Sequence, residues 1–179
     1  MSPAGQYADR SSPADERTMP VTLVLDRLRS AFNVGNIFRI AEALRVRELI
    51  ACGYTARPPH QKLAKTARGC DEAVPCRHAD TAAEAVCELR NAGVAVFAVE
   101  TVENAVPVWD LEVRFPVAFV LGNEALGVAE EALEQCDGAV VLPRFGRKNS
   151  INVANCAAVV LYRAAELWWG KAALQAANE

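Results

Sequence analysis

Short apolar runs alternate with amphipathic segments along this chain from residue 21 onwards. The runs are apolar at nearly every position, which is typical of strands buried on both faces of a parallel sheet. The segments between them carry apolar residues at helical spacing, so the pattern predicts an α/β fold, a mostly parallel sheet with helices on both faces. The expected strands are residues 21–25, 47–52, 73–77, 94–99, 116–121 and 138–142, and the expected helices are residues 34–44, 60–67, 81–92, 128–135 and 150–168.

The helices expected at 34–44 and 150–168 show more detail than the others. Asn33 stands just before the first one and is a residue type that caps helix N-termini. The second carries an apolar seam that runs for about five turns and ends at Trp168. That seam is longer than one crossing of a small sheet requires, so two uses remain open: packing on the sheet alone, or packing in a subunit interface as well.

Length and composition indicate one globular domain. The chain has 179 residues, of which 52% are apolar, and this suffices for a single core. No apolar run approaches the ~20 residues of a membrane span, and the first twenty residues lack the apolar segment of a secretory signal. We therefore expect a cytoplasmic protein with a disordered tail at 1–19, a domain at 20–170 and a C-terminal tail at 171–179.

The six cysteines and two histidines argue against metal chemistry. No two cysteines form a C-x-x-C pair, and no short spacing of cysteine and histidine fits a zinc site. We expect no metal and interpret the cysteines as reduced, buried thiols. A histidine-dependent triad is not expected either, because neither His60 nor His78 stands in the sequence context of a nucleophile.

The formal net charge of −3 conceals a strong segregation of charge. Residues 21–70 carry nine Lys or Arg against three Asp or Glu, a net of +6, and residues 141–163 carry four against none. Between them, residues 71–140 carry three against fourteen, a net of −11. Two basic blocks in an acidic protein favour a polyanion bound at one face, although a solvated, salt-bridged surface would contain the same charges.

Two segments place glycines and polar side chains where apolar elements end. Residues 33–39 read N-V-G-N-I-F-R at the start of a helix, where free N–H groups can bind a phosphate and Arg39 can lean toward the same anion. Residues 121–127 read L-G-N-E-A-L-G after an apolar strand, the place where parallel sheets bind ligands. A capped helix with a surface arginine and an ordinary strand-to-helix turn are the structural alternatives.

A third segment, residues 143–154, reads P-R-F-G-R-K-N-S-I-N-V-A. It combines a basic, glycine-containing loop with Ser150 and Asn152 at the start of the long helix. Ser150 alone is a good N-cap. Asn152 in the first turn, before a wholly apolar seam, points to a function beyond capping.

Residues 20–168 of the chain resemble the TrmH (SpoU) branch of the SPOUT methyltransferases. The resemblance rests on three strings in this order: N-x-G-x-x-x-R, L-G-N-E-x-x-G and P-x-x-G-x-x-x-S-I-N-V-A. The resemblance implies the SPOUT α/β knot, in which the C-terminal part forms a deep trefoil knot. It also implies S-adenosyl-L-methionine as cofactor and a homodimer with composite active sites. The implied reaction is methylation of a ribose 2′-hydroxyl in tRNA or rRNA.

The resemblance also implies roles for single residues. Arg39 matches the arginine regarded as catalytic and Asn33 its partner, while Glu124 matches the acid of the second string. The implied polar pair of the third string is Ser150 and Asn152. The implied cofactor contacts are Glu100, Thr101, Gly122, Leu142 and Ile151, and the expected RNA contacts are Arg57, Lys62, Lys65, Arg68, Arg144, Arg147 and Lys148.

One departure from the family pattern is Arg144, which follows Pro143 where relatives often have Met. We interpret it as an altered contact with RNA rather than a loss of chemistry. The role of Arg39 stays open between base and phosphate clamp, because a free guanidinium stays protonated below a pH of about 12. Glu124 is expected to orient Arg39 or Asn33 rather than to act as the base.

Three other functions are less consistent with the sequence. A dinucleotide-dependent oxidoreductase needs G-x-G-x-x-G after the first strand, and the chain has none. A catalytically silent RNA-binding module of the same fold is disfavoured by the presence of Arg39, Glu124, Ser150 and Asn152. A methyltransferase that acts on a base nitrogen is disfavoured because the strings are of the ribose type.

Overall fold

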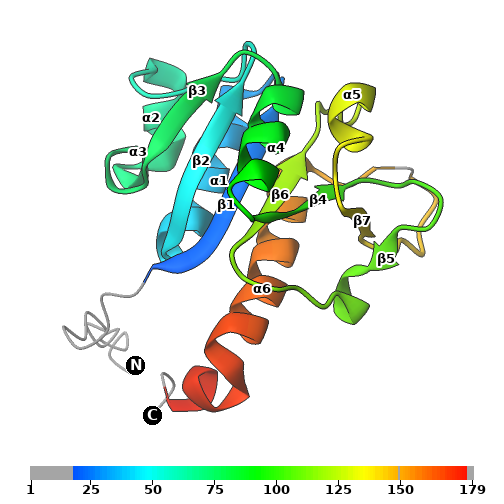
Figure 1. The fold of residues 1–179 in the computed structure, drawn as a ribbon. Helices are drawn as coiled ribbons and strands as arrows, with labels where there is room; N and C mark the ends of the chain where they lie inside the picture. Colours follow the sequence, from blue (N-terminus) through cyan, green and yellow to red (C-terminus); the bar gives the residue numbers. More distant parts are fainter. Residues whose placement is uncertain (1–17, 149, 177–179) are drawn as a thin grey trace.

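A seven-stranded parallel sheet forms the centre of the molecule, which is described by a computed structural model over residues 18–148 and 150–176 (Figure 1). The strands lie in the order β3-β2-β1-β6-β4-β7-β5, and the six pairings between them are all parallel. The expected α/β class with a mostly parallel sheet is therefore confirmed. The strands are β1 (Met19–Asp26), β2 (Val46–Cys52), β3 (Cys76–Ala79), β4 (Ala95–Val99), β5 (Val106–Pro107), β6 (Val117–Leu121) and β7 (Gly138–Val141).

Helices cover both faces of this sheet (Figure 1). One face packs against α1, α2 and α6 around side chains such as Phe38, Leu23 and Leu161. The other packs against α4 and α5 around Val86 and Val120. Because both faces are covered, β1 and β6 are buried along their whole length, which explains their unbroken apolar sequences. The helices are α1 (Ala31–Ala43), α2 (Gln61–Ala67), α3 (Cys70–Ala73), α4 (Ala82–Asn91), α5 (Glu130–Leu133) and α6 (Val153–Ala176), with a 3-10 turn η1 (Val108–Asp110).

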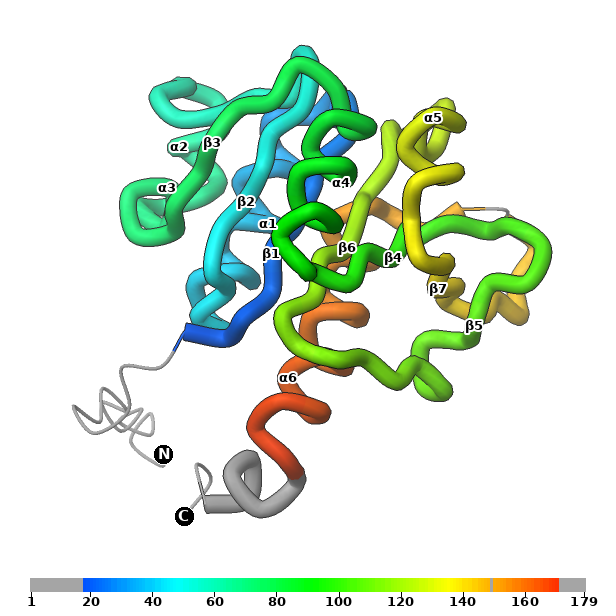
Figure 2. Tube along the Cα trace, in the orientation of Figure 1, coloured from blue at the N-terminus to red at the C-terminus, as the bar shows by residue number. Residues whose placement is uncertain are grey.

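The order of the strands brings distant parts of the chain together. The chain first builds β1, β2 and β3 toward one edge, and then crosses to β4 on the other side (Figure 2). β6 later fills the position between β1 and β4, and β7 adds on the far side of β4. The C-terminal ends of β1, β6, β4 and β7 therefore become neighbours at the end of the sheet where these strands finish.

The smallest elements are where the sequence-based prediction is wrong or incomplete. The strand expected at 73–77 is β3, which begins only at Cys76 because α3 ends at Ala73 and Pro75 has no N–H for a ladder bond. The helix expected at 128–135 is the single turn α5. Neither α3 nor β5 was expected, since elements of two to four residues are too short to show a period.

Both helices that carry functional strings begin at other residues than the sequence predicts. α1 begins at Ala31, and its N-cap is Ser30, whose Oγ accepts a hydrogen bond from the Asn33 N–H at 3.3 Å. Asn33 is thus in the first turn rather than at the cap. α6 begins at Val153, and Asn152 Oδ1 accepts from the Ala154 N–H at 2.9 Å. Ser150 is therefore not the cap, because the side chain that accepts from the first turn is that of Asn152.

The ends of the chain are described in part. The tail expected at 1–19 lies outside the described residues up to residue 17, and Met19 is already a fully buried residue of β1. α6 breaks its helical geometry at Gly170, with φ at 72°, and continues to Ala176, although a tail is expected from residue 171. Within the described ranges, no helix is long and apolar enough to cross a membrane.

Gly35 has a different use from the one its string suggests. It lies inside α1, fully buried, and a Cβ atom there would lie 2.7 Å from Thr66 Cβ and 2.8 Å from the carbonyl oxygen of Leu63, both in α2. The glycine therefore lets α1 and α2 pack closely, and it does not bring backbone to a phosphate.

We expect the Gly35→Ala variant to be less stable than the wild type, by about 1–3 kcal/mol of unfolding free energy. Alanine is the better helix former by about 1 kcal/mol, but the clash with the backbone of α2 outweighs that gain. Urea unfolding followed by circular dichroism measures the difference. The matched control is Gly146→Ala, because a Cβ at Gly146 would meet no atom within 4 Å. An unchanged midpoint for Gly35→Ala would refute the close packing of α1 on α2.

Candidate functional site

The register of the sheet aligns the ends of its four central strands. Leu25 of β1 is paired with Leu121 of β6, and Leu121 is paired with Val99 of β4. Val99 is in turn paired with Val140 of β7. The loops that follow these strands therefore leave the sheet side by side, and the three strings found in the sequence meet there.

A cavity of about 620 Å³ lies between three of these loops and the start of α6. Its walls combine polar and apolar groups from the ends of β4, β6 and β7. The five residues expected to contact a cofactor all line it, namely Glu100, Thr101, Gly122, Leu142 and Ile151. Three of the five residues expected to be catalytic line it too, namely Glu124, Ser150 and Asn152.

The loop after β6 is folded tightly back on itself. Asn123 and Gly127 exchange two backbone hydrogen bonds, at 3.0 and 2.9 Å. A Cβ atom on Gly122 would lie 2.2 Å from the Gly127 carbonyl carbon and from the Val128 nitrogen. Any other residue at position 122 would force this loop open, so the glycine of the second string is required by the loop itself.

Glu100 fastens this loop to the end of β4. Its Oε2 accepts a hydrogen bond from the Val128 N–H at 3.1 Å, and its Oε1 accepts from the Thr101 N–H at 2.8 Å. The carboxylate thus forms one wall of the cavity while its bonds hold two of the three loops together.

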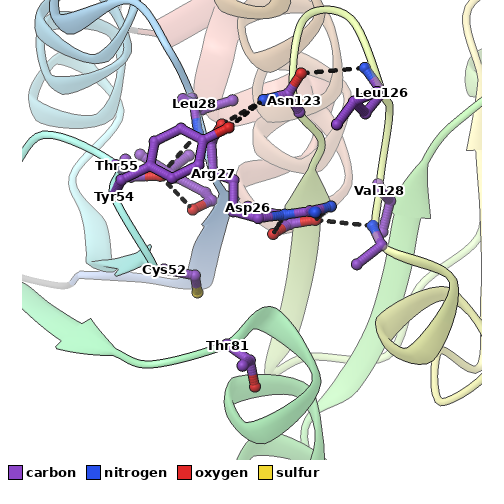
Figure 3. Close-up of polar contacts among 12 residues, drawn as sticks. Asp26, Arg27, Leu28, Cys52, Tyr54, Thr55, Thr81, Asn123, Leu126 and Val128 are labelled. Atoms are coloured by element: carbon purple, nitrogen blue, oxygen red, sulfur yellow. Dashed lines mark hydrogen bonds and ion pairs between the residues drawn. The ribbon is translucent and has the colours of Figure 1, made fainter.

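Asn123 is part of the second string, but its structural role was missed in the sequence. It is 4% exposed, and its Nδ2 donates to the Arg27 carbonyl oxygen at 2.6 Å and to Tyr54 Oη at 2.8 Å (Figure 3). Its Oδ1 accepts from the Ala125 and Leu126 N–H groups at 2.9 and 3.1 Å. The signal in the sequence was an amide that directly follows a glycine at the end of a buried strand. All the polar atoms of this side chain are used in shaping the loop.

Asp26, at the end of β1, was also missed. It is 1% exposed, and it is bound by the Arg27 guanidinium through contacts of 2.8 and 3.0 Å (Figure 3). Its Oδ2 also accepts from the Ala129 N–H at 2.8 Å. A buried carboxylate with an ionic partner is stable in this position, and it ties the start of the α5 segment to β1.

Glu124 binds the segment that leads into α1. Its carboxylate accepts hydrogen bonds from the Arg29 N–H at 2.8 Å, from the Ser30 N–H at 3.1 Å and from Asn33 Nδ2 at 3.0 Å. Burial raises the pKa of this carboxyl, but the hydrogen bonds from Arg29, Asn33 and Ser30 lower it more, and the pKa is below its ordinary value. The phosphate expected at the N-terminus of α1 is thus replaced by an internal carboxylate.

Asn33 and Asn152 extend this contact across the site. Asn152 Nδ2 donates to Asn33 Oδ1 at 3.1 Å, while Asn33 Nδ2 donates to Glu124. One residue from each of the three strings therefore takes part in a single chain of side-chain hydrogen bonds. The expectation that Glu124 orients Asn33 agrees with this geometry.

Arg39 lies apart from the other expected catalytic residues. It is exposed, it does not line the cavity, and it follows Asn33 by six residues, about 9 Å along α1 and on another face. Its surroundings include Cys70 of α3. Burial and the charge of Glu42 raise the pKa of that thiol, whereas the charge of Arg39 lowers it. Within one chain, Arg39 is therefore close enough to α3 to act on the Cys70 thiol, and it is not among the residues that line the cavity with Glu124.

The expected RNA contacts are all exposed and fall into two places. Arg144 lines the cavity and donates from Nη1 to Thr101 Oγ1 at 3.0 Å, and Arg147 and Lys148 follow in the same loop. Asn149, the next residue, lies outside the described part of the chain. The second place is the approach to α2 and the helix itself, with Arg57, Lys62, Lys65 and Arg68.

The thiol in the cavity wall is suited to packing rather than to nucleophilic chemistry. Cys156 lines the cavity, and burial raises the pKa of its thiol, which keeps it protonated near neutral pH. Burial similarly raises the pKa of Cys52 to about 12 and that of Cys136 to about 11. Over residues 18–148 and 150–176, no three His, Cys, Asp or Glu side chains gather as a metal site would require.

Comparison with known proteins identifies relatives in sequence and in fold. A sequence relative from Escherichia coli K12, tRNA (guanosine(18)-2′-O)-methyltransferase, is 28% identical over 159 residues, which cover 89% of this chain and 69% of the relative. The fold is shared with the A. aeolicus TrmH/SpoU tRNA modifying enzyme, with a TM-score of 0.79 and 22% identity over 90% of this chain and 81% of that one.

A second solved structure adds a bound ligand. The SpoU methyltransferase AviRb from Streptomyces viridochromogenes in complex with the cofactor AdoMet has a TM-score of 0.76 and 26% identity, over 87% of this chain and 60% of that chain. The sequence model of the SpoU rRNA methylase family matches residues 20–162, and these residues include all three strings and every strand of the sheet but the first residue of β1. The chain belongs to the SpoU rRNA methylase family.

Proposed function

We propose that this protein transfers a methyl group from S-adenosyl-L-methionine to a ribose 2′-hydroxyl of tRNA or rRNA. The observation that carries the proposal is the chain of hydrogen bonds from Glu124 through Asn33 to Asn152 at the wall of the 620 Å³ cavity. Two relatives support the reaction and the cofactor, since one is named as a tRNA 2′-O-methyltransferase and the other was solved with AdoMet.

The cavity fits this cofactor in size and in chemistry. Its volume lies within the range of about 300–1,000 Å³ that small-molecule sites have. Leu121, Leu142 and Ile151 supply apolar wall for an adenine ring, and the carboxylates of Glu100 and Glu124 complement a positive charge. When bound, S-adenosyl-L-methionine supplies an activated methyl group.

The residues of the chain contribute positioning and polar contacts. The side chains of Asn33 and Asn152 are fixed by hydrogen bonds and can hold a ribose hydroxyl in line for transfer. Glu124 is a poor general base, because the hydrogen bonds that lower its pKa must break before it can accept a proton. Its part is to hold Asn33 in place.

Arg39 completes the site from a second subunit in this proposal. Since it does not line the cavity of its own chain, we infer that it reaches the cavity of the partner chain across a homodimer. There it clamps a phosphate of the RNA and stabilises the negative charge that develops on the 2′-oxygen. The deep trefoil knot belongs to the same proposal and rests on the resemblance to the family. The cytoplasmic location, expected from the sequence, belongs to it as well and agrees with the tRNA-modifying relative.

We expect the purified protein to methylate total tRNA or rRNA from S-adenosyl-L-methionine, and nuclease digestion to release 2′-O-methylated nucleosides. Arg39→Ala should lower this activity at least a hundredfold, the effect of removing one donor that stabilises an oxyanion, which is roughly a hundred- to a thousandfold. Binding of S-adenosyl-L-methionine, measured by calorimetry, should stay unchanged, because the proposed partner of Arg39 is a phosphate of the RNA rather than the cofactor.

The matched control is Arg47→Ala. Arg47 is exposed and lies at the start of β2, so it is at the N-terminal ends of the strands, whereas the cavity is at their C-terminal ends. Full activity in the Arg39→Ala variant would remove Arg39 from the mechanism. A methyl group recovered on a base nitrogen would refute the ribose as the acceptor.

The long helix α6 should form the subunit interface. Its inner face packs on the core, but Val159 and Tyr162 on its outer face are 42% and 59% exposed. Light scattering at micromolar concentration should give twice the mass of one chain, and Tyr162→Glu should give monomers because a charge would be buried against an apolar partner. Ala92→Glu, at the end of α4 on the other face of the sheet, is the control that should stay dimeric.

RNA affinity should depend steeply on salt, because each phosphate contact releases counterions. The slope of log affinity against log salt is roughly −0.7 to −0.9 per contact, so the double variant Arg147→Ala/Lys148→Ala should flatten it by about one to two units. Filter binding between 50 and 200 mM salt, about the range in which such contacts are resolved, measures the slope. The control is the double variant Arg47→Ala/Arg114→Ala, which removes the same amount of charge at the N-terminal ends of β2 and β6. It should leave the slope unchanged. If both double variants keep the wild-type slope and affinity, the basic loop is a solvated surface without contact to RNA.

A further inference from the structure

A second cavity of about 630 Å³ lies next to the one described above. It is formed by the loop after β1, the first turn of α1 and the segment between β2 and α2, all of which are described in the structure. None of the strings that define the family explains the residues of the β2–α2 segment, which read G-Y-T-A-R-P-P-H over residues 53–60.

Two aromatic rings stand in the wall of this second cavity. Tyr54 is 62% exposed and Phe32 is 54% exposed, although large aromatic side chains are usually buried. Tyr54 is also held in place, because its Oη accepts the hydrogen bond from Asn123 Nδ2 at 2.8 Å (Figure 3). Asn123 is itself buried and fixed by three further hydrogen bonds, so the exposed ring has a rigid anchor.

The charges around the two rings have one sign. Arg29, Arg57 and Lys62 line the second cavity with exposed side chains, and His60 stands beside them. The lining residues include no Asp or Glu. The charged side chains of this cavity are all cationic, and two aromatic rings are exposed in its wall. Such a cavity is suited to a ligand that has both a flat ring and negative charge.

The residues that separate the two cavities are hydrogen-bonded directly to one another. Glu124 lines the first, and its carboxylate is bound to the N–H groups of Arg29 and Ser30, which line the second. Asn123 lines the first, and its partner Tyr54 lines the second. A polymeric ligand with one monomer at the first cavity can therefore place a neighbouring monomer in the second.

We propose that the second cavity binds one unpaired nucleotide of the substrate RNA, close to the nucleotide whose ribose is methylated, with its base stacked on Tyr54 and its phosphate at Arg57 and Lys62. This inference rests on the proposed RNA methyltransferase function. Stacking on an aromatic face with a cation at the phosphate is how proteins bind single-stranded RNA without requiring a particular base. The site selects targets in loops, because a base inside a duplex offers no free face to Tyr54.

The experiment compares three variants of the full chain in binding to total tRNA and, separately, to rRNA. Tyr54→Ala removes the ring, and affinity should fall about five- to a hundredfold, the usual effect of losing one base stack. Tyr54→Phe keeps the ring and removes only the bond to Asn123, and it should keep most of the affinity. Trp109→Ala is the control, an aromatic side chain 55% exposed beside edge strand β5, and it should bind as the wild type does.

Salt dependence separates stacking from charge. Tyr54→Ala should leave the slope of log affinity against log salt unchanged, because no phosphate contact is lost. The double variant Arg57→Ala/Lys62→Ala should flatten that slope by about one to two units. Binding of S-adenosyl-L-methionine should be the same in all of these variants, since none of these residues lines the first cavity.

Each contrary result has a distinct meaning. Wild-type affinity in Tyr54→Ala, with normal methylation, overturns the nucleotide site and leaves the methyltransferase standing. An equal loss in Tyr54→Phe and Tyr54→Ala also overturns it, because Tyr54 would then act only through Asn123. If the wild-type protein binds neither tRNA nor rRNA and methylates neither, the proposed function fails, and the nucleotide site fails with it.

Discussion

The carboxylate of Glu124 joins the loop after β6 to the segment that leads into α1. Three donors from the segment before α1 and from its first turn converge on it, and all three are lost as partners if this one side chain is removed. Because Asn33 is one of the three and binds Asn152 in turn, the position of the loop before α6 depends on the same carboxylate. The negative charge is stable there, since it lies at the positive end of α1.

The parallel register of the sheet is the condition that makes this contact possible. Four strand ends align at one edge, so the loops that carry Glu124 and Glu100 leave the sheet in the same direction. Glycine is then needed at position 122, because the loop folds back within van der Waals distance of its own backbone. The polar side chains at this edge mostly bind backbone N–H groups, and they determine the shape of the loops before any ligand is present.

Much of the fold could be predicted from the sequence, because long buried strands and amphipathic helices show clear periods. The cavity could be predicted for a different reason, since the three strings have a fixed relation to the family fold. Local roles could not be assigned so well. Ser30 and Asn33 are both good N-caps, and only the structure shows which one the helix uses. Gly35 is explained by α2, an element about thirty residues later, which no local pattern reveals. The distance of Arg39 from the cavity also depends on how α1 is rotated in its packing, which the spacing in the sequence does not determine.

The hydrogen bonds of the site also determine when it can form as the chain folds. Asn33 is separated from Glu124 by 91 residues and from Asn152 by 119. These hydrogen bonds therefore form only after β6 has joined the sheet and the start of α6 has packed beside it. Contacts of such long sequence separation form slowly, because the loops between them must close first. No fragment that ends before α6 can contain the finished cavity. A ligand that binds there stabilises only the complete fold, and the stabilisation grows with the logarithm of the ligand concentration once that concentration exceeds the dissociation constant.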